Sequence, residues 1–445
     1  MKVDLKTVFG RGWIPSAVAA VLVIAVGAGV LASREGKTRK ERKWYELGTM
    51  SDEILDQVVL FYLGEAWAGL TDVSEVLETA SRVDPKDPRS WTREWRKTAE
   101  RLSRAAGEAE SAGHGLSAGE LRLRESSYWR AALHRHMDAG SPETVEIARR
   151  ETEAFGKAMR LLVLPVEFVE IPFEGTALNA WYYRVPGSGP RPTLITHQGR
   201  DAWAEDNFYI GREALRRGYN CLIVDGPGQG STLRLRGLPF RPDWETVVGS
   251  AVDWLEARPE VDPGRIGLMG LSMGGYLAPR AAVGEPRLAF LIANPGVADW
   301  AGIFLSKIEE ISPMIGRLNR KNPAALDSLM GTIGKLSPFL MWGLTDTMWK
   351  HGASTPSAML KDMERYGRPA GLDRIACPTL IIDGEAEEYG QALSLYDELT
   401  CPKTYLRFTE EEAAPLHVQT ASLALASQRI FDWIDDTVAS TEKRR

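Results

Sequence analysis

The segment Gly270-Leu271-Ser272-Met273-Gly274 constrains the fold of this chain more than any other. It follows an apolar run, residues 266–269, that is typical of a buried strand, and the residues from Tyr276 to Val283 are compatible with a helix. A serine flanked by glycines at this spacing is typical of a sharp strand-to-helix turn, where the serine has a positive φ and larger neighbours would collide. The pattern predicts an exposed nucleophile at Ser272, and a plain glycine-rich turn is the alternative.

Short β-rich segments alternate with helical stretches from residue 166 onward. Such alternation indicates a mainly parallel, doubly wound α/β sheet. Strands are expected at 166–171, 177–184, 193–196, 221–224, 266–269, 290–293, 379–382 and 404–408, and helices at 208–217, 244–256, 391–399 and 422–435. The segment Asp225–Gly230 lacks the spacing of a phosphate-binding loop and is interpreted as a turn after a strand.

The rest of the chain suggests further units around this sheet. Residues 44–162 are rich in Ala, Glu, Arg and Leu with apolar residues at helical spacing, which predicts a domain of three or four antiparallel helices whose Trp and Tyr side chains form a core. Residues 163–440 are expected to form the catalytic domain, with a helical insert rich in Met and Leu at about 300–366. Residues 1–43 precede both.

The stretch from Trp13 to Ala32 carries no charge. At about 1.5 Å per helical residue it is long enough to cross a hydrocarbon core of roughly 30 Å, so it predicts a transmembrane helix. More Lys and Arg residues follow the span than precede it, which favours a single-pass membrane anchor, a basic linker and a catalytic domain in the cytoplasm. The alternative is a signal peptide cleaved near Ala32 and a secreted protein.

Composition excludes several other classes of protein. The net charge of -6 is small for 445 residues, so no basic surface indicates a nucleic-acid partner. Cys221, Cys377 and Cys401 lie far apart without metal-ligand spacing, which predicts free thiols and neither a metal site nor a cofactor. A small-molecule substrate is the expected partner, and the oligomeric state stays open, a homodimer included.

A serine hydroxyl needs a base and an orienting acid, and in enzymes with this turn the chain order is serine, acid, histidine. Only His351 and His417 follow Ser272. His351 falls in the predicted insert and is interpreted as a surface or lid residue. His417 follows the last predicted strand, where the base is expected, so we predict that His417 is the base.

The acid is expected in the loop after the strand at 379–382, where Asp383-Gly384-Glu385-Ala386-Glu387-Glu388 holds several candidates. We select Glu387. Asp383 still belongs to the end of the strand, and Glu385 and Glu388 stay open as alternatives.

Two backbone N–H groups are needed to stabilise an oxyanion. The first is expected from Met273, directly after the nucleophile, and the second from Gly199 or Arg200 in the loop after the strand at 193–196. His197 in the same loop has no ligand partner at metal-binding spacing, so a structural role is predicted.

Several motifs resemble one branch of the α/β-hydrolases, the branch of dihydroxypseudooxynicotine hydrolase and the fungal polyketide-shortening hydrolases of pigment pathways. The resemblance covers the chain from about Trp91 to its end, and the stretches that carry it are 225–230, 237–244, 258–263, 274–280, 408–419 and 431–433, with 95–96 and 126–132 in the helical domain. It implies an α/β-hydrolase fold in which the helical domain and the insert enclose the substrate.

The same resemblance implies hydrolysis of a carbon–carbon bond or an ester in an aryl ketone or acyl-aromatic molecule. Ser272 and His417 match the nucleophile and the base, and Glu387 stands where such enzymes usually carry aspartate. The leading apolar segment is not part of the family pattern. A carboxylesterase or serine peptidase with the same triad is one alternative, and an inactive hydrolase-fold binding module tethered to the membrane is another.

Overall fold

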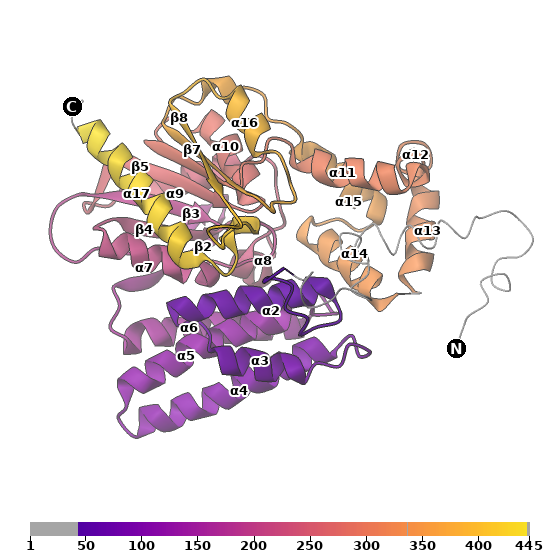
Figure 1. The fold of residues 1–445 in the computed structure, drawn as a ribbon, viewed down its shortest axis with the longest axis horizontal. Helices are drawn as coiled ribbons and strands as arrows, with labels where there is room; N and C mark the ends of the chain where they lie inside the picture. The colour runs from indigo at the N-terminus through magenta and orange to yellow at the C-terminus, as the bar shows by residue number, and fades with distance from the viewer. Residues whose placement is uncertain (1–42, 336, 443–445) are drawn as a thin grey trace, which may run out of the picture.

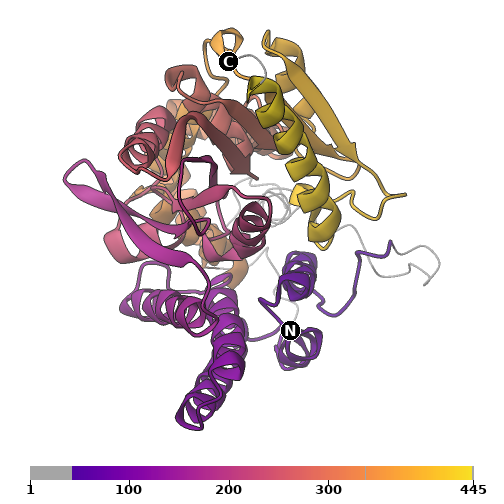
Figure 2. The ribbon, with the colours of Figure 1, turned by 90° about the vertical axis from the view of Figure 1, so that its left-hand side faces the viewer.

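The computed structural model describes residues 43–335 and 337–442 (Figure 1). The described part begins with a group of helices that lies beneath the sheet in Figure 2. In chain order these are α2 (Glu53–Glu65), the 3₁₀ turn η1 (Ala66–Ala68), α3 (Val73–Ser81), α4 (Ser90–Ser111), α5 (Gly115–Leu133) and α6 (Pro142–Leu161). Five α-helices thus stand where three or four were expected, because the short α3 separates α2 from α4.

Aromatic side chains form the core of these helices, as their spacing predicts. Trp95 is fully buried, and its ring centroid lies 5.3 Å from that of Trp91, 5.4 Å from that of Tyr62 and 5.6 Å from that of Tyr128. Offset aromatic pairs at such distances stabilise a core beyond the area that they bury. The rings therefore join α2, α4 and α5 into one packed unit.

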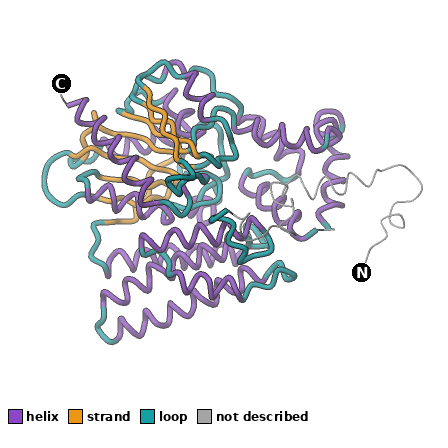
Figure 3. Tube along the Cα trace, in the orientation of Figure 1, coloured by secondary structure: helices purple, strands orange, loops and turns teal. Residues whose placement is uncertain are grey.

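A mostly parallel sheet of eight strands follows, with helices on both faces (Figure 3). The strands are β1 (Val166–Phe173), β2 (Thr176–Tyr183), β3 (Arg191–His197), β4 (Asn220–Asp225), β5 (Val261–Leu271), β6 (Phe290–Asn294), β7 (Thr379–Gly384) and β8 (Lys403–Phe408). Their order is β1-β2-β4-β3-β5-β6-β7-β8, and β2 pairs antiparallel with β1 and β4 while the other pairs are parallel. The predicted α/β sheet is confirmed.

Alternate residues of each strand face two different cores. The helices that cover the sheet are α7 (Phe208–Arg216), α8 (Gly230–Arg236), α9 (Trp244–Glu256), α10 (Gly274–Gly284), α16 (Ala392–Glu398) and α17 (Leu423–Glu442), with the 3₁₀ turns η2 (Glu205–Asn207) and η5 (His417–Gln419). In β3, Ile195 packs into the core beneath α9 and α10, whereas Leu194 packs into the core beneath α7 and α17. Burial on both faces explains the apolar runs in the central strands, such as 221–224 in β4 and 290–293 in β6.

A helical insert separates β6 from β7 and lies to the right of the sheet in Figure 1. Its elements are α11 (Trp300–Ile311), α12 (Pro313–Lys321), α13 (Pro323–Gly334), α14 (Pro338–Lys350) and α15 (Pro356–Met363), followed by η3 (Glu364–Tyr366) and η4 (Leu372–Arg374). Proline opens four of these helices, and the side chains of Asn322, Ser337 and Thr355 cap α13, α14 and α15. These local signals explain the sharp turns between short helices.

The predicted membrane span, Trp13 to Ala32, lies outside the described residues. Within residues 43–335 and 337–442, every helix is too short or too polar to cross a membrane. This finding contradicts the predicted transmembrane anchor and the predicted location at a membrane, so both predictions are wrong. The three cysteines are free thiols, as predicted.

Candidate active site

Ser272 lies in the turn between β5 and α10, at the carboxyl edge of the parallel strands. Its φ is 59°, in the left-handed region that non-glycine residues seldom adopt. A Cβ at Gly270 would lie 1.9 Å from the backbone oxygen of Gly274, so a side chain there would block the start of α10. The backbone N–H of Ser272 donates to the Asn294 oxygen of β6 over 2.7 Å, which holds the strained residue in place.

The structure brings His417 to the serine. His417 is in η5, between β8 and α17, and its Nε2 lies 2.8 Å from Ser272 Oγ. Its Nδ1 lies 2.8 Å from Oε2 of Glu387. A carboxylate only accepts hydrogen bonds, so Nδ1 carries the proton of the neutral ring and Nε2 is left to accept from the serine hydroxyl. This is the arrangement that a serine nucleophile needs.

The four candidate acids, at the end of β7 and in the loop after it, contact different partners. The side chain of Glu387 is 2 % exposed, and its other oxygen accepts from the backbone N–H of Tyr389 over 3.1 Å. Asp383 instead accepts from the hydroxyl of Tyr405, and Glu385 accepts from the N–H of Glu410. Glu388 is exposed. Glu387 is therefore the acid that reaches His417.

Gly199 approaches Ser272 closely on its other side. A Cβ added there would lie 2.5 Å from Cβ and 2.8 Å from Oγ of Ser272, and 2.7 Å from the N atom of Met273. The side-chain amide of Gln229 donates to the Gly199 oxygen over 3.0 Å and also to the Gln198 oxygen. In a trans peptide the N–H points away from the preceding C=O, so the N–H groups of Gly199 and Arg200 point away from Gln229.

Two other histidines, His197 and His351, are buried and form contacts that suit a structural role. His197 is buried, its Nε2 accepts from the indole N–H of Trp244 over 3.2 Å, and burial lowers its pKa to about 4. His351 was expected at the surface or in a lid; it does lie at the end of α14 in the insert, but it is buried and its Nδ1 is 2.8 Å from Oδ2 of Asp362. Burial lowers the pKa of His351.

Tyr389 is a residue of this site that the sequence pattern did not indicate. Its ring centroid lies 4.7 Å from that of His417, edge to face, and 5.4 Å from that of Trp300 at the start of α11. Burial raises the pKa of its hydroxyl, which interacts with Ser272. The sequence could have indicated Tyr389, because it lies two residues after Glu387 in the loop that brings the acid to the site.

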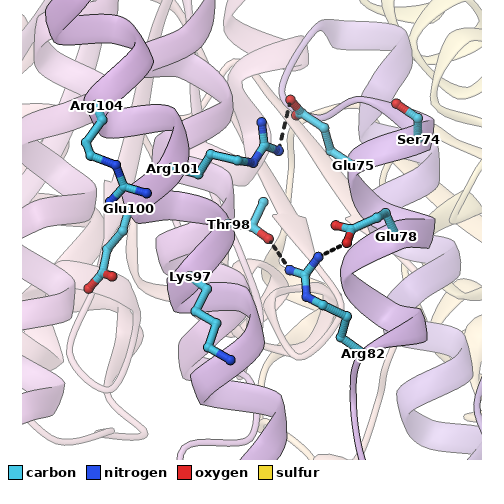
Figure 4. A pocket seen from close by; sticks show the side chains of 9 residues that line it. All are labelled: Ser74, Glu75, Glu78, Arg82, Lys97, Thr98, Glu100, Arg101 and Arg104. Atoms are coloured by element: carbon cyan, nitrogen blue, oxygen red, sulfur yellow. Dashed lines mark hydrogen bonds and ion pairs between the residues drawn. The ribbon is translucent and has the colours of Figure 1, made fainter.

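Two features lie away from these residues. A groove of about 740 Å³ lies between α3 and α4, where Arg82 contacts Glu78 and Arg101 is 3.6 Å from Glu75 (Figure 4). His136, Asp138 and Glu143 bring possible metal-ligand atoms within 4.8 Å of one another. Arg89 pairs with Asp138 and Arg96 with Glu143, so arginines already neutralise both carboxylates.

Known proteins resemble this chain over most of its length. A family model described as the alpha/beta hydrolase family matches residues 185–426. The hydrolase ORFZ of Pyricularia oryzae is 32% identical over 84% of this chain and 94% of its own length, and the 20-hydroxy-prefusarin hydrolase FUS2 of Gibberella moniliformis is 30% identical over 83% and 92%. The solved structure of 2,6-dihydroxy-pseudo-oxynicotine hydrolase is 23% identical, with a TM-score of 0.65 over 85% of this chain and 96% of that one.

Proposed function

Because the chain belongs to the alpha/beta hydrolase family, we propose that it is a serine hydrolase that works through a covalent acyl-enzyme. The observation that carries this proposal is the continuous line of hydrogen bonds from Glu387 through His417 to Ser272, with 2.8 Å in each step. The positive φ of Ser272 supports it, because backbone strain of this kind is kept at functional turns.

In the first half of the proposed reaction, Ser272 Oγ attacks the substrate carbonyl and His417 Nε2 takes the hydroxyl proton. Glu387 holds the ring in the required tautomer and stabilises the imidazolium that forms. The negative charge on the carbonyl oxygen is stabilised by the N–H of Met273 and by one from the Gly199–Arg200 loop. The intermediate then collapses, and His417 returns the proton to the leaving group as the acyl-enzyme forms.

In the second half, water replaces the leaving group. His417 removes a proton from the water, the hydroxide attacks the acyl carbonyl, and the collapse of the second intermediate releases the acid and returns the proton to Ser272. No other reactant is needed, and each proton passes through Nε2 of His417.

We propose a small aryl ketone or acyl-aromatic substrate, cleaved at a carbon–carbon bond or an ester. Aromatic side chains beside the site support this proposal, because Trp300 contacts Tyr389 and Tyr389 contacts His417. One relative is named a 20-hydroxy-prefusarin hydrolase. For carbon–carbon cleavage the leaving group must be a stabilised carbanion, and protonation by His417 would assist its departure.

Pre-steady-state kinetics with p-nitrophenyl acetate test the proposal. We expect a burst of p-nitrophenol of about one equivalent per enzyme, followed by slower turnover, and the Ser272→Ala variant should lose both. Turnover of simple esters alone, in a panel that includes aryl β-diketones, would favour the carboxylesterase alternative. A folded wild-type protein without burst or turnover would contradict the proposal and favour an inactive binding module.

A further inference from the structure

Four charged side chains join the loop beside the nucleophile to helix α14 of the insert. Arg200 and Asp201 come from the loop after β3, and Asp346 and Lys350 come from α14. The Arg200 guanidinium lies 3.0 Å from Asp201 and 3.2 Å from Asp346, and Lys350 Nζ lies 2.5 Å from Asp201 and 2.9 Å from Asp346. Each cation thus contacts both anions. We call these four residues the loop–insert cluster.

Lys350 and Asp346 are buried, so each of these two charges needs a partner of opposite charge. The side chain of Lys350 is 4 % exposed and that of Asp346 is 11 % exposed. A buried charge that loses its partner is strongly unfavourable, whereas two cations alternating with two anions leave the cluster neutral. The side chain of Asp201 is 52 % exposed, and partial desolvation opposes its ionisation, but the nearby Arg200 and Lys350 outweigh this and lower the pKa of Asp201. Withdrawal of α14 would leave Arg200 and Asp201 without these partners.

Helix α14 is itself held near both of its ends. The backbone N–H of Phe240 donates to the Lys350 oxygen over 2.8 Å at the carboxyl end. At the other end, the guanidinium of Arg135 from the region after α5 lies 4.5 Å from the centre of the Phe339 ring. The hydroxyl of Thr347 also accepts from Arg200 over 2.6 Å. The insert is therefore a fixed support for the Arg200 side chain.

The cluster holds the loop on one side, and Gln229 holds it on the other. Gln229 binds the oxygens of Gln198 and Gly199. The very next residue, Arg200, carries the cluster, so the peptide between Gly199 and Arg200 is constrained from both directions. That peptide supplies one of the two N–H groups expected to stabilise the oxyanion.

We propose that Asp346 and Lys350 are positioning residues for the oxyanion hole, so that docking of the insert and assembly of the hole are a single event. The inference rests on the proposed serine hydrolase function and adds a means of regulation to it. With α14 docked, the oxyanion hole is fully assembled when substrate is bound. With α14 withdrawn, the loop of Gly199 and Arg200 would lose the support of Asp346 and Lys350. Closure would thereby couple exclusion of water to catalysis.

Steady-state kinetics of five variants, Lys350→Arg among them, test this inference. Asp346→Asn and Lys350→Met break the cluster, Thr347→Val removes the uncharged contact to Arg200, and Glu309→Gln is a matched control that breaks the exposed pair of Glu309 with Arg320 elsewhere on the insert. Turnover of p-nitrophenyl acetate, the rate of phosphonylation by a fluorophosphonate, and the midpoint of thermal unfolding are measured for each. The small ester is chosen so that contacts between substrate and insert contribute as little as possible to KM.

We expect Asp346→Asn and Lys350→Met to lower kcat and the phosphonylation rate together by about 10- to 100-fold, with KM within about threefold, because only transition-state contacts are lost. Lys350→Arg should recover part of the rate. Thr347→Val should lower kcat by about threefold, and Glu309→Gln should match wild type.

A rise in KM with unchanged kcat would overturn the inference, because the cluster would then only hold the insert closed. Unchanged kinetics in all variants would overturn it as well. If the charge variants do not fold, Thr347→Val decides, and an unchanged kcat for that variant is evidence against the inference. A folded wild type without turnover or labelling would instead overturn the proposed function, and this inference with it.

Discussion

Glu387 and His417 are joined by a hydrogen bond of 2.8 Å, and the glutamate side chain is almost fully buried. Glu388, the next residue, is exposed. The loop turns back after β7, where the Glu387 N–H donates to the Gly384 oxygen, and the Tyr389 N–H holds the second carboxylate oxygen.

This difference between neighbouring glutamates predicts a sharp contrast in activity. Glu387→Gln should lower kcat by about 10³- to 10⁴-fold, because an amide stabilises neither the correct tautomer nor the imidazolium. Glu388→Gln should stay within about twofold of wild type. Steady-state turnover of both variants, checked for folding by circular dichroism, makes the comparison. Equal losses in the two variants would refute the assignment of the acid.

A methyl group at Gly199 should damage the site without unfolding the protein. In Gly199→Ala the new carbon would lie 2.5 Å from Ser272 Cβ, so the loop must move away from the nucleophile. We expect kcat to fall by about 100-fold, and the free energy of unfolding to fall by about 1–3 kcal/mol. Kinetics and urea unfolding measure the two effects. Retention of full activity would show that the loop does not form the oxyanion hole.

The sequence was sufficient to predict the family, the sheet and the serine turn. Apolar runs bounded by glycine and proline indicate the central strands. The Gly-x-Ser-x-Gly spacing indicates the turn, because few other sequences can adopt so sharp a strand-to-helix turn. The branch resemblance drawn from short motifs is confirmed by the family match. Ser272, Glu387 and His417 come together in the structure, although their catalytic roles stay predictions.

Other features depend on contacts that no local pattern reveals. The sequence pattern predicts a turn over Asp225–Gly230. In the structure, α8 already begins at Gly230, the last residue of that predicted turn. The acid could not be selected firmly, since four acidic residues fall within the six positions 383–388, at the end of β7 and just after it. The loop–insert cluster joins residues about 150 positions apart in sequence, so only the folded chain shows it.

A buried ionic group joins α5 and α6 to η2, which follows the loop of Gly199 and Arg200. Arg130 of α5 contacts Glu151 of α6 over 2.8 Å and Asp206 of η2 over 2.5 Å, and its side chain is fully buried. Arg130→Met should destabilise the protein by about 3–5 kcal/mol, because two buried carboxylates lose their partner. Urea unfolding measures the loss. A change below about 1 kcal/mol would mean that the carboxylates become neutral without cost.

Glu65 in the same region should make stability fall as pH rises. Both of its carboxyl oxygens are buried, and burial, reinforced by the nearby Asp206, raises its pKa well above the usual value. The folded state therefore holds this proton more tightly than the unfolded state, and stability is lost above the unfolded pKa of about 4.3. Glu65→Gln cannot ionise, so its stability should depend less steeply on pH.

Urea unfolding of this variant at pH 6 and pH 9 measures the slope. We expect the difference in unfolding free energy between the two pH values to be smaller by about 1 kcal/mol or more in Glu65→Gln than in wild type. The exposed Glu153, changed to Gln, is the control and should behave as wild type. An undiminished slope in Glu65→Gln would contradict the buried, protonated state of this side chain.

The central claim, that Ser272 is a nucleophile activated by His417, is tested most directly by mass spectrometry after reaction with a fluorophosphonate. The account predicts one adduct per wild-type chain, located on the peptide that contains Ser272, with no adduct in Ser272→Ala and labelling slowed by about 10³-fold or more in His417→Ala. An adduct that persists in Ser272→Ala, or a folded wild-type protein that stays unlabelled, would contradict it.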